Sequence, residues 1–324
     1  MWWQYLIIGV LSLFGVIVVV DLIAGAIVMT KLSKPHKRDN NELHEYELAE
    51  KKFNDEWLKI PFEKLELQSD YNYKLYARLY MAKIPTNNYI IALHGHNSSS
   101  LSQLKYLSIF KDMGFNVFIP DHRRSGISEG DTITFGCYEK HDTIKWMDEL
   151  QQRNPRATFG IFGESMGAAT ATMITSMDRR IRFLIEYCGY ANFKNLIMPR
   201  VKSLFVYYLV KPSMKIMARI IGGFKIGQTD ARKAMQKVKV PALIMHSKAD
   251  KLVPVCSAYT LQKANPKAEM ILFDDAPHAR SYMYNEQQYR NAIETFIISH
   301  GVQPAPSSPP LVEAPEKIEH ENIY

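Results

Sequence analysis

The sequence predicts an α/β fold in which a mostly parallel central sheet is covered by helices on both faces. Two observations support this class. From about residue 62 the chain carries short apolar runs separated by turn residues, a pattern typical of strands. Most of the later runs are separated by segments of helical length, such as 139–151 and 166–178. Apolar strands that alternate with helices imply βαβ crossovers, and therefore parallel strands that are buried on both sides.

Eight runs are candidate strands. The first two alternate between apolar and polar residues and could form an antiparallel edge, whereas the later six are more continuously apolar. In chain order the candidates are "FEKLELQS", "KLYARLYMA", "YIIALHG", "NVFIPD", "TFGIFG", "RFLIEYCG", "ALIMHS" and "EMILFDD".

The amino terminus has the length and composition of a membrane-spanning helix. Leu6–Met29 holds 24 residues with one charged side chain, Asp21. About 20 helical residues cross the ~30 Å hydrocarbon layer, so the run is long enough to span it. Interfacial aromatics precede the run and the cations of "KLSKPHKR" follow it. We therefore expect a single-pass anchor over residues 1–30, in the cell membrane.

A cleaved signal peptide and a buried core helix are the two alternatives to an anchor. The small-residue stretch "AGA" at 24–26 resembles a signal-peptide cleavage site, but no Lys or Arg precedes the apolar run, and the run continues beyond the site. A buried core helix is disfavoured by the unbroken length of the run. An acid inside a membrane span is a functional candidate by default, which makes Asp21 worth locating.

The cations around the span predict its orientation. Lys31, Lys34, Lys37 and Arg38 follow the span and only the terminal amine precedes it, so the positive-inside rule places the globular part in the cytoplasm. The extracellular side is the alternative.

The formal net charge of +7 comes without a nucleic-acid-binding signature. It therefore favours a membrane surface over nucleic acid as a partner. The oligomeric state is not predicted.

The remaining chain divides into three expected parts. Residues 31–61 form a charged linker or helix, 62–300 a catalytic domain, and 301–324 a Pro-rich, disordered tail. Within the domain, an insertion at about 190–238 lacks a strand pattern and holds ten Lys or Arg against one acid. We favour a cap of amphipathic helices with a solvated basic face. The alternative is a lid that rests on an anionic membrane or admits an acyl chain.

Two serines lie in G-x-S-x-G patterns, and their contexts differ. A nucleophile elbow needs a strand before the serine and a helix after it. Ser165 follows the strand candidate "TFGIF" and precedes the helix candidate "MGAATATMITSM". Ser128 lies on a loop between "DHRRSGI" and "EGDTITFG", which match neither element. Ser165 is therefore the candidate nucleophile.

A serine nucleophile needs a base that a third group orients. His278 follows the last candidate strand, and Asp250 follows the strand before it. The chain order Ser165, Asp250, His278 is the order expected for an α/β-hydrolase. Asp274 and Asp275 are rival acids, but they share the loop of His278. The other histidines have structural explanations; His246, for example, ends a strand.

The same topology predicts an oxyanion hole. One donor is expected to be the backbone N–H of Met166, directly after the nucleophile at a helix start. The second is expected from His96, in "YIIALHGHNSSS" after an early strand. An ordinary strand-to-helix turn explains the same stretch equally well.

The sequence does not indicate a cofactor. Three widely spaced cysteines (Cys137, Cys188, Cys256) lack a C-x-x-C pair, which argues against a disulfide framework or a zinc site. We expect neither a metal nor an organic cofactor.

Together, these motifs resemble the α/β-hydrolase superfamily, and within it the membrane-anchored, serine-aminopeptidase-like or Bem46-like hydrolases of Gram-positive bacteria. The resemblance covers about residues 62–300 and rests on "LHGHNSSS", "PDHRRSGISEG", "GESMGAATA", "HSKADKLVP" and "APHARSYMYNEQQYRNAIETFI". It implies Ser165 as nucleophile, Asp250 as orienting acid and His278 as base, with His96 and Met166 at the oxyanion positions. It also explains Ser128 as part of a family turn.

Two residues depart from the family pattern. Ser247 replaces a usual glycine, which could alter the placement of Asp250, and Ser125 replaces a common histidine.

The predicted function is hydrolysis of a small-molecule ester, or less readily a thioester or amide, by a Ser-His-Asp triad through an acyl-enzyme. The alternatives are a non-catalytic, membrane-tethered binding module with the same fold, because folds do not fix functions, and a lipid-directed esterase with a basic lid.

Overall fold

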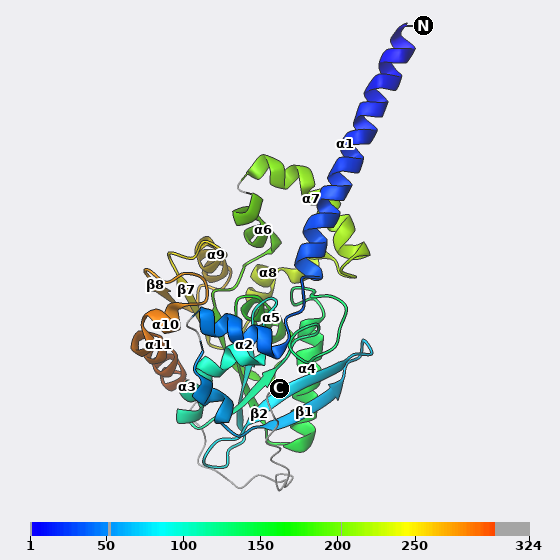
Figure 1. Ribbon diagram of the computed structural model, residues 1–324. Coiled ribbons are helices and arrows are strands. Elements are labelled where there is room, and N and C mark those ends of the chain that lie inside the picture. The colour runs from blue at the N-terminus through cyan, green and yellow to red at the C-terminus, as the bar shows by residue number, and fades with distance from the viewer. Residues whose placement is uncertain (1, 51–52, 202, 302–324) are drawn as a thin grey trace.

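The computed structural model describes residues 2–50, 53–201 and 203–301. In Figure 1 these residues form a rounded body from which one long helix, α1 (Trp2–Ser33), projects. The tail expected over 301–324 lies, apart from Gly301, outside the described residues.

The body is built on one sheet with the strand order β1-β2-β4-β3-β5-β6-β7-β8. The pairs from β4 to β8 are parallel, whereas β1 pairs with β2 and β2 with β4 in antiparallel register. Each of the eight predicted runs coincides with a strand that extends at most one residue beyond it, and the early pair forms the antiparallel edge. The strands are β1 (Glu63–Gln68), β2 (Lys74–Tyr80), β3 (Asn88–Leu93), β4 (Asn116–Pro120), β5 (Thr158–Glu164), β6 (Ile181–Tyr187), β7 (Ala242–Ser247) and β8 (Glu269–Phe273).

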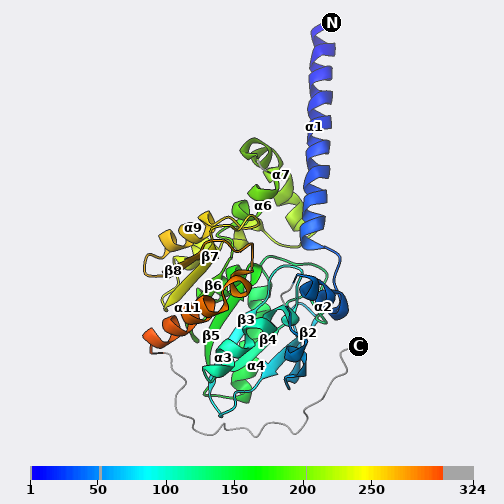
Figure 2. The ribbon, with the colours of Figure 1, turned by 60° about the vertical axis from the view of Figure 1, so that its left-hand side comes forward.

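Helices connect the strands and cover the sheet (Figure 2). The α-helices after α1 are α2 (Asn40–Ala49), α3 (Leu107–Asp112), α4 (Glu139–Arg153), α5 (Met166–Thr175), α6 (Phe193–Val201), α7 (Leu204–Ile220), α8 (Ala231–Met235), α9 (Cys256–Ala264), α10 (Ser281–Tyr284) and α11 (Glu286–Ser299). The described residues also form the short 3₁₀ helices η1 (Asp55–Lys59), η2 (Ser100–Tyr106) and η3 (Ile226–Thr229).

Both faces of the sheet are buried in apolar cores. Successive residues of a strand point to opposite faces, and in β3 this sends Ile91 and Leu93 to one core and Ile90 and Ala92 to the other. The first core includes side chains of α4, α5, α8 and α9, and the second includes side chains of α3 and α11. The mostly parallel, doubly covered sheet predicted from the apolar runs is therefore confirmed.

The charged segment at 31–61 contains α2 and η1. A capping box begins α2: Asp39 Oδ1 accepts a hydrogen bond from the Glu42 N–H (2.8 Å), and Glu42 Oε2 accepts one from the Asp39 N–H (3.1 Å). These two bonds satisfy N–H groups that a helix start leaves without acceptors.

The first helix contains the whole apolar run, and it is long and apolar enough to cross a membrane. Its three buried residues, Gly25, Met29 and Ser33, lie near its carboxyl end. There it packs on α7. Ser213 Oγ donates a hydrogen bond to Asp21 Oδ1 (3.0 Å), and a Cβ on Gly25 would lie 2.6 Å from Ser213 Oγ. Asp21 therefore has a polar partner on another element of the protein.

The insertion expected at about 190–238 contains α6, α7, η3 and α8, and its described residues include no strand. It leaves the sheet after β6 and returns to it at β7. Figure 1 shows α6 and α7 on the side of the body from which α1 projects.

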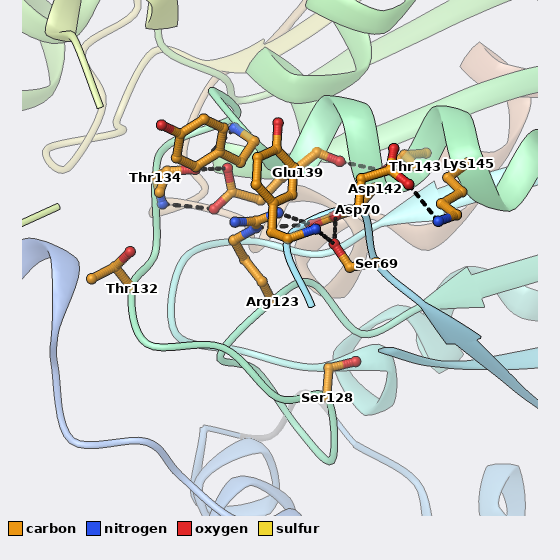
Figure 3. Close-up of polar contacts among 12 residues, drawn as sticks. Ser69, Asp70, Arg123, Ser128, Thr132, Thr134, Glu139, Asp142, Thr143 and Lys145 are labelled. Carbon is orange, nitrogen blue, oxygen red and sulfur yellow. Dashed lines mark hydrogen bonds and ion pairs between the residues drawn. The ribbon is translucent and has the colours of Figure 1, made fainter. Parts of the chain in front are cut away.

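A buried ion pair ties the turn after β4 to α4 (Figure 3). Arg123 is 3% exposed, and its guanidinium contacts Asp142 Oδ2 at 2.6 Å. Ser69 Oγ donates to the other carboxylate oxygen of Asp142 (2.6 Å). The rings of Tyr71 and Tyr138 lie 4.4 and 5.1 Å from the guanidinium carbon. The pair therefore joins three segments that are distant in sequence.

Replacing Arg123 with methionine leaves Asp142 buried without its counter-charge. We expect Arg123→Met to lower the free energy of unfolding by about 3–5 kcal/mol. The control is Lys145→Met on the same helix, whose partner Asp70 is 68% exposed. It should change this free energy by less than about 1 kcal/mol. Denaturant unfolding of the full chain in detergent measures both; equal effects would contradict the role of the buried pair.

Candidate active site

Ser165 lies at the turn between β5 and α5, with φ 57° and ψ −114°. A positive φ is strained for a residue with a side chain, so the surrounding packing must enforce it. Two glycines make this packing possible. A Cβ on Gly163 would lie 2.3 Å from the Gly167 carbonyl oxygen, and a Cβ on Gly167 would lie 2.2 Å from the Leu93 carbonyl oxygen. Both glycines of the pattern are therefore required by close backbone contacts.

His278 lies in the loop after β8 and bridges two of the predicted site residues. Its Nε2 lies 2.8 Å from Ser165 Oγ, and its Nδ1 lies 2.6 Å from Asp250 Oδ2. Because a carboxylate accepts hydrogen bonds, we assign the ring proton to Nδ1, which leaves Nε2 free to accept the serine proton. The structure thus brings together Ser165, His278 and Asp250.

Asp250 is fixed by its own backbone. Its Oδ1 accepts hydrogen bonds from the N–H groups of Leu252 and Val253, both at 2.9 Å. Ser247, at the position where the family usually has glycine, does not move the carboxylate out of reach of His278. The rival acids Asp274 and Asp275 are exposed, and Lys248 Nζ donates to Asp274 (2.6 Å).

A second histidine contacts the acid, although the sequence indicated only a strand-end role for it. His246 Nε2 lies 3.4 Å from Asp250 Oδ2 and 2.8 Å from the Val253 carbonyl oxygen. Burial opposes the ionisation of Asp250, but hydrogen bonds from His246 and His278 outweigh burial and hold its pKa below its ordinary value. Asp250 is therefore a carboxylate at neutral pH, as an acid that orients a histidine must be.

Glu186 on β6 is a buried acid next to this group. No side chain donates a hydrogen bond to its two carboxylate oxygens in the described part of the chain, and the backbone of Gly189 lies beside them. Burial raises the pKa of Glu186 to about 7, and the charge of His246 opposes this shift only in part.

Cys188 packs beside the acid and the base. Its Sγ, an Asp250 oxygen and a His278 nitrogen lie within 4.8 Å of one another. Metals bind the thiolate form of cysteine, but burial raises the pKa of Cys188 well above its ordinary value. In the structure as it stands, Cys188 is therefore a neutral thiol beside Asp250 and His278.

The two expected oxyanion donors lie beside the serine. Met166 begins α5, so its N–H is among the first N–H groups of a helix, which lack intrahelical acceptors. His96 follows β3, but its ring turns away: Nε2 donates to the Leu32 carbonyl oxygen of α1 (2.7 Å), and the ring stacks on Phe135. The His96 ring is therefore held by α1 and Phe135, and the oxyanion role of the His96 backbone N–H stays a prediction.

The turn with the second G-x-S-x-G pattern supports the loop that carries His96. Asp121 Oδ1 accepts a hydrogen bond from the Ser100 N–H (2.6 Å). Ser128 is buried; its Oγ donates to the Asp121 carbonyl oxygen and accepts from the Tyr76 N–H, both at 2.9 Å. Ser128 is thus engaged in holding the turn, which agrees with the choice of Ser165 as the candidate nucleophile.

A pocket opens over the serine. Its lining includes Ser165, His278, His96 and Met166. Its walls come from α1, α2 and α6 and from nearby loops: Leu32, Arg38, Glu47, Phe135, Tyr190, Leu196 and Arg200. The end of the apolar helix is therefore part of the pocket wall.

A buried network below the serine was not predicted from the sequence. Lys105 Nζ lies 2.8 Å from Glu164 Oε2, and the Tyr106 hydroxyl donates to the same oxygen (2.5 Å). Lys105 is 1% exposed. Burial disfavours its charge, but Glu164 and Glu47 outweigh burial and raise the pKa of Lys105. The sequence feature that could have indicated this network is an acid, Glu164, at the end of an apolar strand next to the candidate nucleophile.

Glu186 makes the stability of the protein depend on pH. Because its pKa is higher in the folded state, the folded state binds more protons than the unfolded state between pH 4.5 and about 7. Stability therefore falls as the pH rises across this window, by on the order of 3 kcal/mol. We expect Glu186→Gln to flatten this slope in unfolding curves. Glu286→Gln, an exposed control, should keep it. An unchanged slope in Glu186→Gln would contradict the prediction.

Comparisons with known proteins identify the family of the chain. Residues 85–216 match the family model described as serine aminopeptidase, S33. An uncharacterized Bacillus subtilis protein, YqkD, is 33% identical over 248 residues, which cover 73% of this chain and 81% of the relative. The pimeloyl-[acyl-carrier protein] methyl ester esterase of Aliivibrio fischeri is 26% identical over 120 residues, 37% of this chain and 45% of that protein.

Solved structures show the same fold. An esterase of Pyrococcus furiosus superposes with a TM-score of 0.62 at 21% identity, over 76% of this chain and 95% of that one. At this identity the likeness bears on the fold alone.

Proposed function

The chain belongs to the serine aminopeptidase S33 family of α/β-hydrolases, which are serine hydrolases, and on this premise we propose that Ser165, His278 and Asp250 form the catalytic triad of an esterase. One observation carries the proposal: His278 hydrogen-bonds Ser165 Oγ through one ring nitrogen and Asp250 through the other. A serine hydroxyl is a weak nucleophile until such a base takes its proton.

The first half-reaction acylates the serine. Ser165 Oγ attacks the ester carbonyl carbon while His278 Nε2 takes the hydroxyl proton. Asp250 accepts the Nδ1–H bond and stabilises the imidazolium that forms. The backbone N–H groups of Met166 and His96 donate to the carbonyl oxygen as it becomes an oxyanion. His278 then returns the proton to the departing alcohol oxygen, which leaves an acyl group on Ser165.

The second half-reaction releases the acid. A water molecule attacks the acyl carbon and gives its proton to His278 Nε2. The tetrahedral intermediate collapses, Ser165 Oγ leaves, and His278 protonates it. All proton transfers use residues of this chain.

An ester is the favoured substrate class. Among the relatives, the Aliivibrio fischeri protein is a methyl ester esterase, whereas the family description names an aminopeptidase. A thioester or an amide would follow the same steps, with the amide harder to cleave because its leaving group is poorer.

Anchoring in a membrane is the second part of the proposal. The length, composition and exposure of α1 support a span, and Lys31, Lys34, Lys37 and Arg38 after it favour a cytoplasmic domain.

The triad is tested by labelling with a fluorophosphonate probe. Wild-type protein should be labelled, and Ser165→Ala should not. Ser128→Ala, the matched variant in the other G-x-S-x-G pattern, should keep the label. Asp250→Asn should reduce kcat on p-nitrophenyl esters by about 10⁴-fold, because the histidine loses its orienting acceptor. Equal labelling of Ser165→Ala would refute the assignment, and an unlabelled wild type would favour the non-catalytic binding module.

Orientation is tested with a native cysteine. Cys256 is exposed, whereas Cys137 and Cys188 are buried. A membrane-impermeant maleimide should therefore label Cys256 after permeabilisation of the cells but not in intact cells, and Cys256→Ser should remove the signal. Labelling of intact cells would place the domain outside.

A further inference from the structure

The helix α7 has three distinct faces. Tyr207, Met214 and Ala218 are buried in the first apolar core. A second face is apolar but exposed: Phe205, Leu209, Ile216 and Ile220 are 77%, 50%, 47% and 71% exposed. At about 100° per residue, these four lie within one stripe of the helix.

The third face is cationic. Lys211, Lys215 and Arg219 follow one another at intervals of four residues, so they form a row along the helix. None of the three has a carboxylate partner in the described part of the chain, and α7 contains no acid. Lys211 Nζ does lie over the rings of Tyr207 and Tyr208. An exposed apolar stripe beside a row of cations without carboxylate partners is the pattern of a helix that lies in a membrane interface.

The position of α7 relative to α1 gives a second, independent observation. Ser213 is bound to Asp21 and packed on Gly25, and both lie within the apolar run Leu6–Met29. From Asp21 to Met29 a helix rises about 12 Å. The contact thus lies in the last ~12 Å of a run that is long enough to cross the ~30 Å hydrocarbon layer. Figures 1 and 2 both show α7 beside this part of α1.

We propose that α7 lies in the surface layer of an anionic bilayer, with Phe205, Leu209, Ile216 and Ile220 among the acyl chains and Lys211, Lys215 and Arg219 at the lipid headgroups. The exposed face of α7 lies against the leaflet at the carboxyl end of α1, because the face continues the apolar surface of α1. If α1 spans the membrane, α7 cannot be surrounded by water, because Ser213 of α7 is hydrogen-bonded to Asp21 in the last turns of the apolar run of α1.

This arrangement places the pocket at the membrane face. Leu32 of α1 and Leu196 and Arg200 of α6 line the pocket, and α6 leads directly into α7. An ester carried by a lipid of the same leaflet therefore reaches Ser165 without crossing water. This substrate class rests on the proposed esterase activity, whereas the placement of α7 rests only on the proposed membrane span of α1.

The placement is tested in full-length protein reconstituted into liposomes. In a Cys256→Ser background, Ile216→Cys carries an environment-sensitive fluorophore. The control is Ile298→Cys on α11, where the isoleucine is similarly exposed (54% against 47%). Doxyl-labelled lipid should quench the first probe at least threefold more than the second. Replacing Lys211, Lys215 and Arg219 with glutamine should weaken the quenching in vesicles containing phosphatidylglycerol but not in pure phosphatidylcholine.

Two outcomes would overturn the placement. Equal quenching of the two probes would show that α7 stays in water. Quenching that depends on protein density rather than on doxyl lipid would show that the face contacts a second copy of the chain.

The substrate class is tested with Ile216→Ser/Ile220→Ser. Hydrolysis of a long-chain ester embedded in vesicles should fall at least tenfold, and hydrolysis of p-nitrophenyl acetate should stay within twofold of wild type; Ile298→Ser should affect neither. Equal loss on both esters, or no loss on either, would refute delivery from the leaflet. If the wild type hydrolyses neither ester, the esterase proposal fails, and the probe experiment still decides the position of α7.

Discussion

The close approach of α5 to the carboxyl end of β3 is the constraint on which the site depends. The contact between Gly167 and the Leu93 carbonyl leaves no room for a side chain, and it fixes how sharply the chain turns at Ser165. That turn raises the hydroxyl to the end of the sheet, where the loops after β3, β7 and β8 converge. A looser turn would leave the base and acid in place with no serine in reach of His278.

Around this turn, polar groups are held by buried partners rather than by exposed ones. Asp250 is fixed by two backbone N–H groups and two histidines, and Asp121 fixes the loop that carries His96. Such groups lose their hydrogen bonds to water on folding, and hydrogen bonds within the protein must replace them. A site built in this way is rigid before substrate arrives, and orientation of reacting groups is a large part of catalysis.

The sequence predicted the strands and the convergence of Ser165, Asp250 and His278, because apolar runs, turn residues and chain order follow from local pattern and topology. It did not predict pairs that depend on side chains far apart in the chain. Asp21 and Ser213 meet across 192 residues, and Arg123 finds Asp142 on a helix whose rotation no local pattern specifies. For the same reason, the sequence could not show that His246, at a strand end, contacts the acid.

The hydrogen bond from His96 to the Leu32 carbonyl has a practical consequence. Workers who want a soluble enzyme usually delete an amino-terminal apolar helix as a dispensable tether. In this protein a deletion through residue 33 removes one wall of the pocket and the acceptor that orients the His96 ring. In a shortened protein the loop that carries His96 would lack this contact, and a low turnover measured on it would be misread as a property of the native enzyme.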